Sequence, residues 1–289
     1  MPQTFPDEGP PKLIEVRGLV KRYGDHVILN GLTLTVERGE TCVIIGGSGS
    51  GKSTFARLLV GLERPDEGEI LVDGVDIVPL RGRALEAVRR KFAIVFQSRA
   101  LLDSMSVFDN VAFPLREGTH LREAEIGQQV HLALSELEVD DASASLPAQL
   151  SGGMAKRVGI ARAVVMQPEI LVYDEPTSGL DPVSSRVVDR LIERMRDHHG
   201  VTSVVITHDM VTAYDVADRV VLLADGKAAV QGTPEQLFRE HAKEIEPFSQ
   251  ASGIDLERLA PRSKRKTVAA VRAEWEAAHP PDAQDPLSR

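Results

Sequence analysis

The chain has 289 residues, enough for one large domain or two modest ones, and its 42% hydrophobic and 27% charged residues are ordinary for a globular protein. The net charge of -9 argues against a general nucleic-acid-binding protein, which normally carries a basic face, so we expect no nucleic-acid partner. The single cysteine, Cys42, excludes an internal disulfide bond and is typical of a reducing compartment.

The N-terminal residues 1–12 are rich in proline and have neither the basic start nor the apolar stretch of a secretory signal, so we expect them to be disordered. The longest apolar runs, such as VVLLA at 220–224, are much too short to span a bilayer. The sequence therefore predicts a cytoplasmic protein, which another protein must hold at the membrane if it works there.

Short runs of β-branched residues predict strands at 13–20, 27–36, 41–46, 69–73, 92–96, 169–173, 203–207 and 219–224. Helical patterns separate many of these runs, which is typical of an α/β fold with parallel strands. Between about 98 and 165 the pattern predicts helices and loops without a strand, and therefore an inserted helical subdomain. The strands stop near residue 242, so 243–289 is expected to be a partly helical extension with a disordered end.

A glycine-rich motif, GGSGSGKST, lies between the apolar run TCVII and a helical pattern and matches G-x-x-x-x-G-K-[ST]. Its glycines let backbone N–H groups turn toward phosphates, whereas a merely flexible loop would not explain the lysine. Lys52 would neutralise the β- and γ-phosphates, and the Ser53 hydroxyl would bind Mg²⁺. The predicted nucleotide-binding residues are Gly46, Gly47, Ser48, Gly49, Ser50, Gly51, Lys52, Ser53 and Thr54.

Two carboxylates follow the next strand-like run, in EILVYDEP at 169–176. Asp174 would hold Mg²⁺ through water, and Glu175 would polarise the water that attacks the γ-phosphate. Paired acids at a strand end are in other proteins mere solvated loop charges. The phosphate loop earlier in the chain favours the functional interpretation.

Three more polar residues lie at strand ends or in a turn, where a parallel sheet places its ligands. Gln97 is expected to contact Mg²⁺ and the attacking water, His208 to sense the γ-phosphate, and Tyr23 to stack on adenine. Each alone has an ordinary alternative, a satisfied surface residue or, for the tyrosine, packing. These roles are favoured because the three residues occur in the same chain as the phosphate loop.

These motifs, together with LSGGM at 150–154 and SGLD at 178–181, resemble in kind and order those of the ATP-binding cassette (ABC) ATPases. The resemblance covers about residues 13–242. It implies an α/β P-loop NTPase fold: a RecA-like core, an antiparallel β subdomain and an inserted helical subdomain at about 98–165. It also implies ATP and Mg²⁺ as cofactors.

In that family two cassettes pair head to tail. The signature motif of each cassette, which corresponds to LSGGM in this chain, caps the ATP bound by the other cassette. The resemblance therefore implies a homodimer in which Ser151, Gly152 and Gly153 contact the γ-phosphate in trans and Asp181 links the two sites. The family's usual fifth signature residue is Gln, and this chain has Met154 instead. The phosphate contacts fall on earlier positions, so we expect activity to be retained.

Two stretches, 96–117 and 149–163, are most similar to the ATPases of Mla-type (MCE-associated) lipid transporters of bacterial envelopes. That likeness implies a membrane permease, an MCE-domain lipid-binding protein and a small regulatory subunit as partners. It also places the chain at the cytoplasmic face of the inner membrane through the permease. Amino-acid and other small-solute importers have near-identical cassettes, and non-transport ABC ATPases are the alternative of a different class.

Two apolar groups have open interpretations. Leu101, Leu102, Met105, Val107 and Phe108 form either core of the helical subdomain or a surface for a permease helix. In the extension, RSKRK at 262–266 precedes a helical stripe of Val268, Val271 and Trp275. We expect this stripe to dock on the partner cassette or an accessory subunit, and the alternative is a solvated tail.

Overall fold

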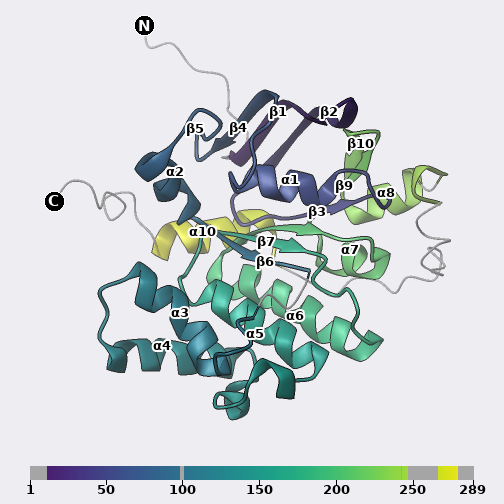
Figure 1. The fold of residues 1–289 in the computed structure, drawn as a ribbon. Helices are drawn as coiled ribbons and strands as arrows, with labels where there is room; N and C mark the ends of the chain where they lie inside the picture. The colour runs from purple at the N-terminus through teal and green to yellow at the C-terminus, as the bar shows by residue number, and fades with distance from the viewer. Residues whose placement is uncertain (1–11, 98–100, 242, 247–265, 279–289) are drawn as a thin grey trace, which may run out of the picture.

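A computed structural model describes residues 12–97, 101–241, 243–246 and 266–278. The predicted disordered ends, apart from Lys12, and the basic run up to Arg265 lie outside these residues. Figure 1 shows three layers: a small sheet at the top, a larger sheet across the middle and a group of helices below. This arrangement confirms the predicted α/β class.

The small sheet is antiparallel, with strand order β2-β1-β4-β5. Its strands are β1 (Lys12–Tyr23), β2 (His26–Glu37), β4 (Glu67–Val72) and β5 (Val75–Asp76). The turn between β1 and β2 uses Gly24 at φ +59, a conformation that glycine adopts without steric cost. This sheet is the antiparallel β subdomain that the resemblance implies.

The large sheet has strand order β10-β9-β3-β8-β7-β6, and every neighbouring pair except β10 with β9 is parallel. Its strands are β3 (Thr41–Ile45), β6 (Phe92–Val95), β7 (Ile170–Asp174), β8 (Thr202–Ile206), β9 (Arg219–Ala224) and β10 (Lys227–Gly232). β3 and β8 are buried along their whole length, as central parallel strands covered on both faces must be. The carboxyl ends of β3, β6, β7 and β8 all lead into predicted site residues.

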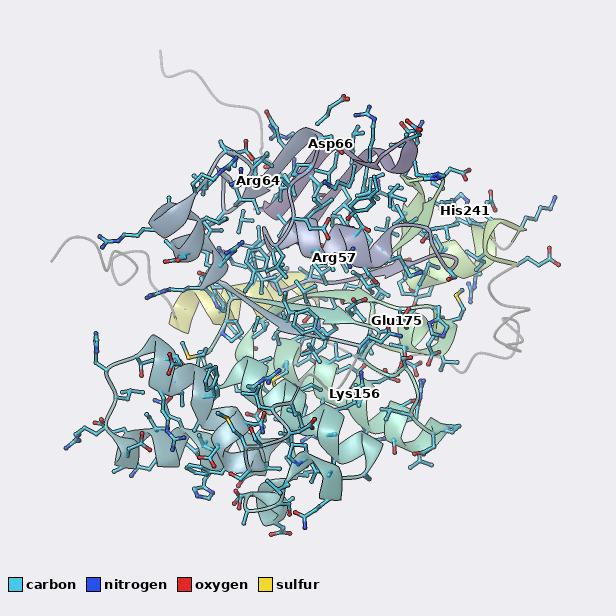
Figure 2. All side chains as sticks on the ribbon, in the orientation of Figure 1. Arg57, Arg64, Asp66, Lys156, Glu175 and His241 are labelled. Atoms are coloured by element: carbon cyan, nitrogen blue, oxygen red, sulfur yellow. The ribbon has the colours of Figure 1, made fainter. Side chains whose placement is uncertain are left out.

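Two apolar cores lie on the two faces of this sheet, and side chains fill the space between the layers (Figure 2). The upper core joins the sheet to the antiparallel strands and to α1 (Lys52–Leu59), and it includes the buried Cys42. Helix α2 (Gly82–Arg89) precedes β6. Burial raises the pKa of the Cys42 thiol to about 12, so this residue is a small hydrophobic side chain and not a reactive thiol.

The lower core contains the helical subdomain, with α3 (Val107–Gly118), α4 (Glu123–Glu136) and α5 (Gly152–Val164). Two short 3₁₀ helices, Asp140–Ala142 and Pro147–Gln149, precede α5. The sheet domain adds α6 (Pro182–His199), α7 (Met210–Val216) and α8 (Pro234–Glu240). The apolar group near Gln97 divides: Leu101 and Val107 are buried core, whereas Leu102 is 40% exposed.

Helix α10 (Val268–Ala278) packs on its own chain, beside the turn before β3 and the end of α6. A Cβ added to Gly39 would lie 3.0 Å from Val271 Cγ1, and one on Gly200 would lie 2.8 Å from Trp275 Cδ1. The Arg38 guanidinium carbon is 4.2 Å from the centre of the Trp275 ring. These contacts contradict the alternative of a solvated tail, because Val271 and Trp275 pack against Gly39 and Gly200 of their own chain. Docking of the stripe on a partner stays a prediction.

In the part of the chain that the structure describes, no helix combines the length and the hydrophobicity that crossing a bilayer requires.

Candidate nucleotide site

The glycine-rich loop connects the end of β3 at Ile45 to the start of α1 at Lys52. Gly51 has φ +101, and a Cβ on it would lie 2.9 Å from Leu29 Cδ2. A Cβ on Gly46 would lie 2.5 Å from the Leu223 carbonyl oxygen. No side chain caps the first N–H groups of α1. These N–H groups and the positive end of the helix dipole are therefore available to an anion such as phosphate.

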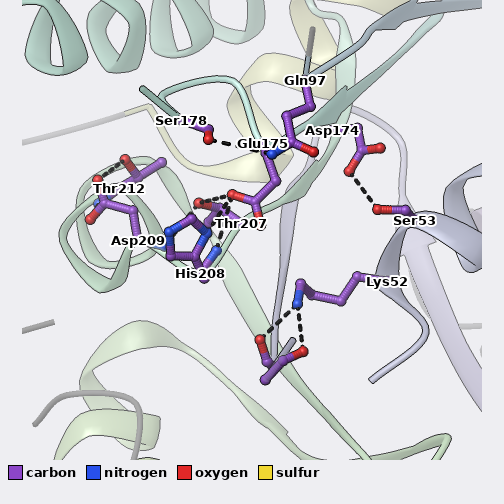
Figure 3. Close-up of polar contacts among 12 residues, drawn as sticks. Lys52, Ser53, Gln97, Asp174, Glu175, Ser178, Thr207, His208, Asp209 and Thr212 are labelled. Atoms are coloured by element: carbon purple, nitrogen blue, oxygen red, sulfur yellow. Dashed lines mark hydrogen bonds and ion pairs between the residues drawn. The ribbon is translucent and has the colours of Figure 1, made fainter. Parts of the chain in front are cut away.

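Lys52 folds back into this loop. Its Nζ donates to the carbonyl oxygens of Gly46 at 2.7 Å and Gly47 at 2.9 Å (Figure 3). Burial lowers the pKa of Lys52, and the nearby carboxylates of Glu175 and Asp174 act in the opposite direction. The structure thus places a cation inside the loop, where phosphate charge would be neutralised.

Ser53 and Asp174 come together from α1 and the end of β7. The Ser53 hydroxyl donates to Asp174 Oδ1 over 3.1 Å. Burial raises the pKa of Asp174, while the hydrogen bond from Ser53 lowers it. A half-buried carboxylate beside a hydroxyl is a suitable pair of hard oxygen ligands for Mg²⁺.

The described residues contain no group of three or more His, Cys, Asp and Glu side chains that would hold a metal ion. Mg²⁺ commonly binds through one or two protein oxygens together with water and nucleotide phosphates, and Ser53 and Asp174 fit that mode. The site therefore suits an ion that arrives with its nucleotide, in keeping with the predicted cofactors.

Glu175 and His208 meet at the ends of the adjacent strands β7 and β8 (Figure 3). Glu175 is 8% exposed, and its Oε2 lies 2.8 Å from His208 Nδ1. The Thr207 hydroxyl and the His208 backbone N–H donate to the same oxygen over 3.5 and 3.4 Å. Glu175 has φ +52, a strained conformation for a non-glycine residue, of the kind that functional sites retain. These contacts hold a buried carboxylate in one orientation.

Gln97 follows β6, and its amide donates to the Ser178 hydroxyl over 3.4 Å. Asp181 begins α6 as its N-cap, accepting from the N–H groups of Val183 and Ser184. Gln97 therefore contacts the segment that leads from β7 to α6, and Asp181 ends that segment.

A cavity of about 1080 Å³ unites most of these groups. Its lining includes Gly46 to Thr54, Gln97, Glu175, Ser178, Arg186 and His208. Tyr23 does not belong to the described lining of this cavity, and its hydroxyl donates to Glu63 instead. The stacking of Tyr23 on adenine stays a prediction. Ile28 also lines the cavity, as an apolar residue that the sequence motifs did not indicate.

The signature segment, LSGGM at 150–154, lies elsewhere on the chain. Ser151 is the N-cap of α5 and accepts from the Met154 N–H over 3.2 Å. A Cβ on Gly153 would lie 3.2 Å from the Ser184 hydroxyl oxygen, so this glycine lets α5 approach the start of α6 closely. Ser151, Gly152 and Gly153 are absent from the described lining of the nucleotide cavity. The N-termini of α1 and α5, both of which could bind phosphate, therefore lie at separate places on one chain.

One contact residue was missed in the sequence. Lys156 lies on α5 and is buried, with its Nζ reaching main-chain oxygens at the ends of β6 and β7. The signal was present: a lysine within the largely small and apolar helix GGMAKRVGIARAV must either reach solvent or find polar partners.

The sequence profile of ABC transporters matches residues 29–178. The chain is 42% identical to the intermembrane phospholipid transport system ATP-binding protein MlaF of Haemophilus influenzae, over 82% of this chain and 89% of that protein. Among solved structures, it is similar to the dimeric cassette MJ0796 bound to ADP and Pi, with TM-score 0.71, 30% identity and coverage of 76% and 98%. It is also similar to cbiO1 from Clostridium perfringens, part of the transporter complex cbiONQ, with TM-score 0.74, 31% identity and coverage of 84% and 100%.

Proposed function

The chain belongs to the ABC transporter family as an ATP-hydrolysing cassette, and we propose that it drives the movement of phospholipid or another lipid between membranes of a bacterial envelope. The observation that carries the lipid assignment is the similarity to the phospholipid-transport ATPase of Haemophilus influenzae. That similarity extends over 82% of the chain and not only over the shared motifs.

In this proposal the loop from Gly46 to Thr54 cradles the phosphates of ATP, and Lys52 leaves its carbonyl partners to neutralise phosphate charge. Ser53 and Asp174 would hold Mg²⁺, the latter through water, with Gln97 as a further contact. Bound Mg²⁺ supplies charge neutralisation to the β- and γ-phosphates. Tyr23 would stack on adenine through the face of its ring, which the hydrogen bond from its hydroxyl to Glu63 does not occupy.

Glu175 is the proposed general base. Its burial and its contact with His208 Nδ1 orient the carboxylate, so that its free face can accept a proton from an attacking water molecule. His208 is 66% exposed in its side chain and can contact a γ-phosphate while holding Glu175. In Figure 3, Gln97 lies on the other side of Glu175 from His208, where it would complete the site of the attacking water.

The separation of the signature segment from the cavity supports a head-to-tail homodimer. Ser151, Gly152 and Gly153 would then contact the ATP bound by the partner chain, and Asp181 would lie between the two sites. The dimeric state of the similar cassette MJ0796 supports this assembly.

In this proposal a permease holds the dimer at the cytoplasmic face of the inner membrane. The similarity to cbiO1, which is part of an ABC transporter complex, supports a membrane partner and does not identify the face. The similarity to MlaF, a protein of a phospholipid transport system, suggests an MCE-domain lipid-binding protein as a further partner. The small regulatory subunit stays a prediction. A permease that copurifies with the tagged chain would identify the assembly directly.

The test is lipid transfer by the copurified complex in proteoliposomes that contain a fluorescent phospholipid. We expect ATP-dependent transfer that disappears with Glu175→Gln. An amino-acid-binding protein that copurifies and stimulates ATP hydrolysis, with no lipid moved, would replace this proposal with a small-solute importer.

A further inference from the structure

Lys156 connects the helix that begins at the signature motif to the catalytic edge of the sheet. It lies on α5, only 5% of its surface is exposed, and in Figure 2 it lies on the helical side of the sheet, near Glu175. Its Nζ donates to the Gln97 carbonyl oxygen over 2.5 Å and reaches the carbonyl oxygens of Phe96 and Glu175 at 3.4 Å. One ammonium group therefore joins α5 to the ends of two neighbouring strands, β6 and β7.

A lysine suits the chemistry of these contacts. An ammonium has three N–H donors, and the partners are carbonyl oxygens that extend from two chain segments. Burial lowers the pKa of Lys156, while the carboxylates of Asp174 and Glu175 act in the opposite direction and favour the charged form. Charge-assisted hydrogen bonds of this kind are roughly twice as strong as neutral ones.

Two of the three residues whose carbonyl oxygens Lys156 contacts also line the nucleotide cavity. Gln97 and Glu175 both line that cavity, and the Glu175 backbone is strained at φ +52. A backbone held in such a conformation needs contacts that prevent it from relaxing. Lys156 provides one, from an element whose first residues lie outside the cavity.

We propose that Lys156 is a positioning residue for ATP hydrolysis, which fixes the backbone at Gln97 and Glu175 relative to the signature helix α5. A displacement of α5 then shifts the groups that orient the attacking water. Lys156 does not touch the nucleotide in this account, so its loss impairs the chemical step more than ATP binding. The inference depends on ATP hydrolysis by this chain and not on the lipid cargo.

The experiment compares Lys156→Met with Arg157→Met in the full-length chain, by steady-state ATPase activity and by binding of a fluorescent ATP analogue. Arg157 is the matched control, because this neighbouring cation on α5 also donates to main-chain oxygens, those of Leu137 and Glu138, but within the helical subdomain. We expect Lys156→Met to lower kcat by about ten- to a hundredfold, with KM changed by less than about threefold. Arg157→Met is expected to keep kcat within about twofold of the unmodified chain, whatever its effect on stability.

Lys156→Arg keeps the charge and the donors and is expected to recover part of the lost kcat. If Lys156→Met does not fold, Lys156→Gln, which keeps N–H donors without the charge, takes its place in the same comparison. Unchanged kcat in the folded variant would overturn the proposal. So would a rise in KM at constant kcat, or an equal loss of kcat in Arg157→Met.

Discussion

Asp189 gives the fold a dependence on pH that a single substitution removes. This carboxylate lies on α6 and is buried, with its Oδ2 3.0 Å from Arg186 Nη1. Burial is the main cause that raises the pKa of Asp189 to about 7; Arg186 opposes the rise, and the charges of Asp209 and Asp215 add to it. We predict that Asp189→Asn stabilises the protein more at pH 8 than at pH 6.

The sign and size follow from proton binding. An unfolded aspartate has a pKa of about 3.9, so between about pH 4 and pH 7 the folded state holds a proton that the unfolded state has lost. The free energy of unfolding therefore falls as the pH rises through this range and levels off above pH 7. With about 1.4 kcal/mol per pH unit, a group of pKa about 7 costs about 1.4 kcal/mol more at pH 8 than at pH 6. Asparagine removes that difference.

Thermal unfolding, followed by circular dichroism, measures this pH-dependent difference in stability. The Tm of Asp189→Asn minus that of the unmodified chain should rise by about 3 to 5 °C between pH 6 and pH 8. Asp141→Asn changes an exposed aspartate and is the control, for which the Tm difference should not change with pH. A Tm difference for Asp189→Asn that is the same at both pH values would refute the reasoning.

Three further substitutions test the site and the C-terminal helix. Glu175→Gln should bind ATP but lower kcat by at least about a hundredfold, measured by phosphate release, and a near-normal rate would remove Glu175 from the role of base. Lys52→Ala should instead weaken binding of a fluorescent ATP analogue by at least about tenfold, and unchanged affinity would contradict its placement. Gly200→Ala should lower Tm and shift the emission of the chain's single tryptophan to the red, because the new Cβ would lie 2.8 Å from Trp275 Cδ1. Gly74→Ala carries the same left-handed backbone with nothing within 4 Å, so equal losses of Tm in the two variants would rule out the contact.

Local sequence predicted the parts of this fold that depend on local chemistry. The phosphate loop and the acids after β7 follow from motifs whose spacing fixes a strand, a turn and a helix. Strand β10 was missed, because its sequence KAAVQG has little β propensity. The turn before it was readable: Asp225 and Gly226 both have positive φ, and Asp-Gly between two paired strands indicates a hairpin.

The missed features depend on which distant segments meet. Tyr23 is expected to stack on adenine, and nothing in the sequence around it shows that its hydroxyl donates to Glu63, 40 residues along the chain. The apolar stripe of α10 was correctly read as needing cover, yet nothing in its sequence could show that Gly39 and Gly200 leave room for it on the same chain. Periodicity shows that a face is buried and does not identify its partner.

The central claim, an ATPase whose sites are each completed by the partner chain, is tested most directly by mixing two inactive variants. Lys52→Ala impairs the phosphate loop, and Ser151→Arg blocks the signature helix start. A mixed dimer contains one site in which an intact loop faces an intact signature. We predict that the mixture hydrolyses ATP faster than either variant alone at the same total concentration. No gain over the two separate variants, when mixed dimers are shown to form, would contradict the account.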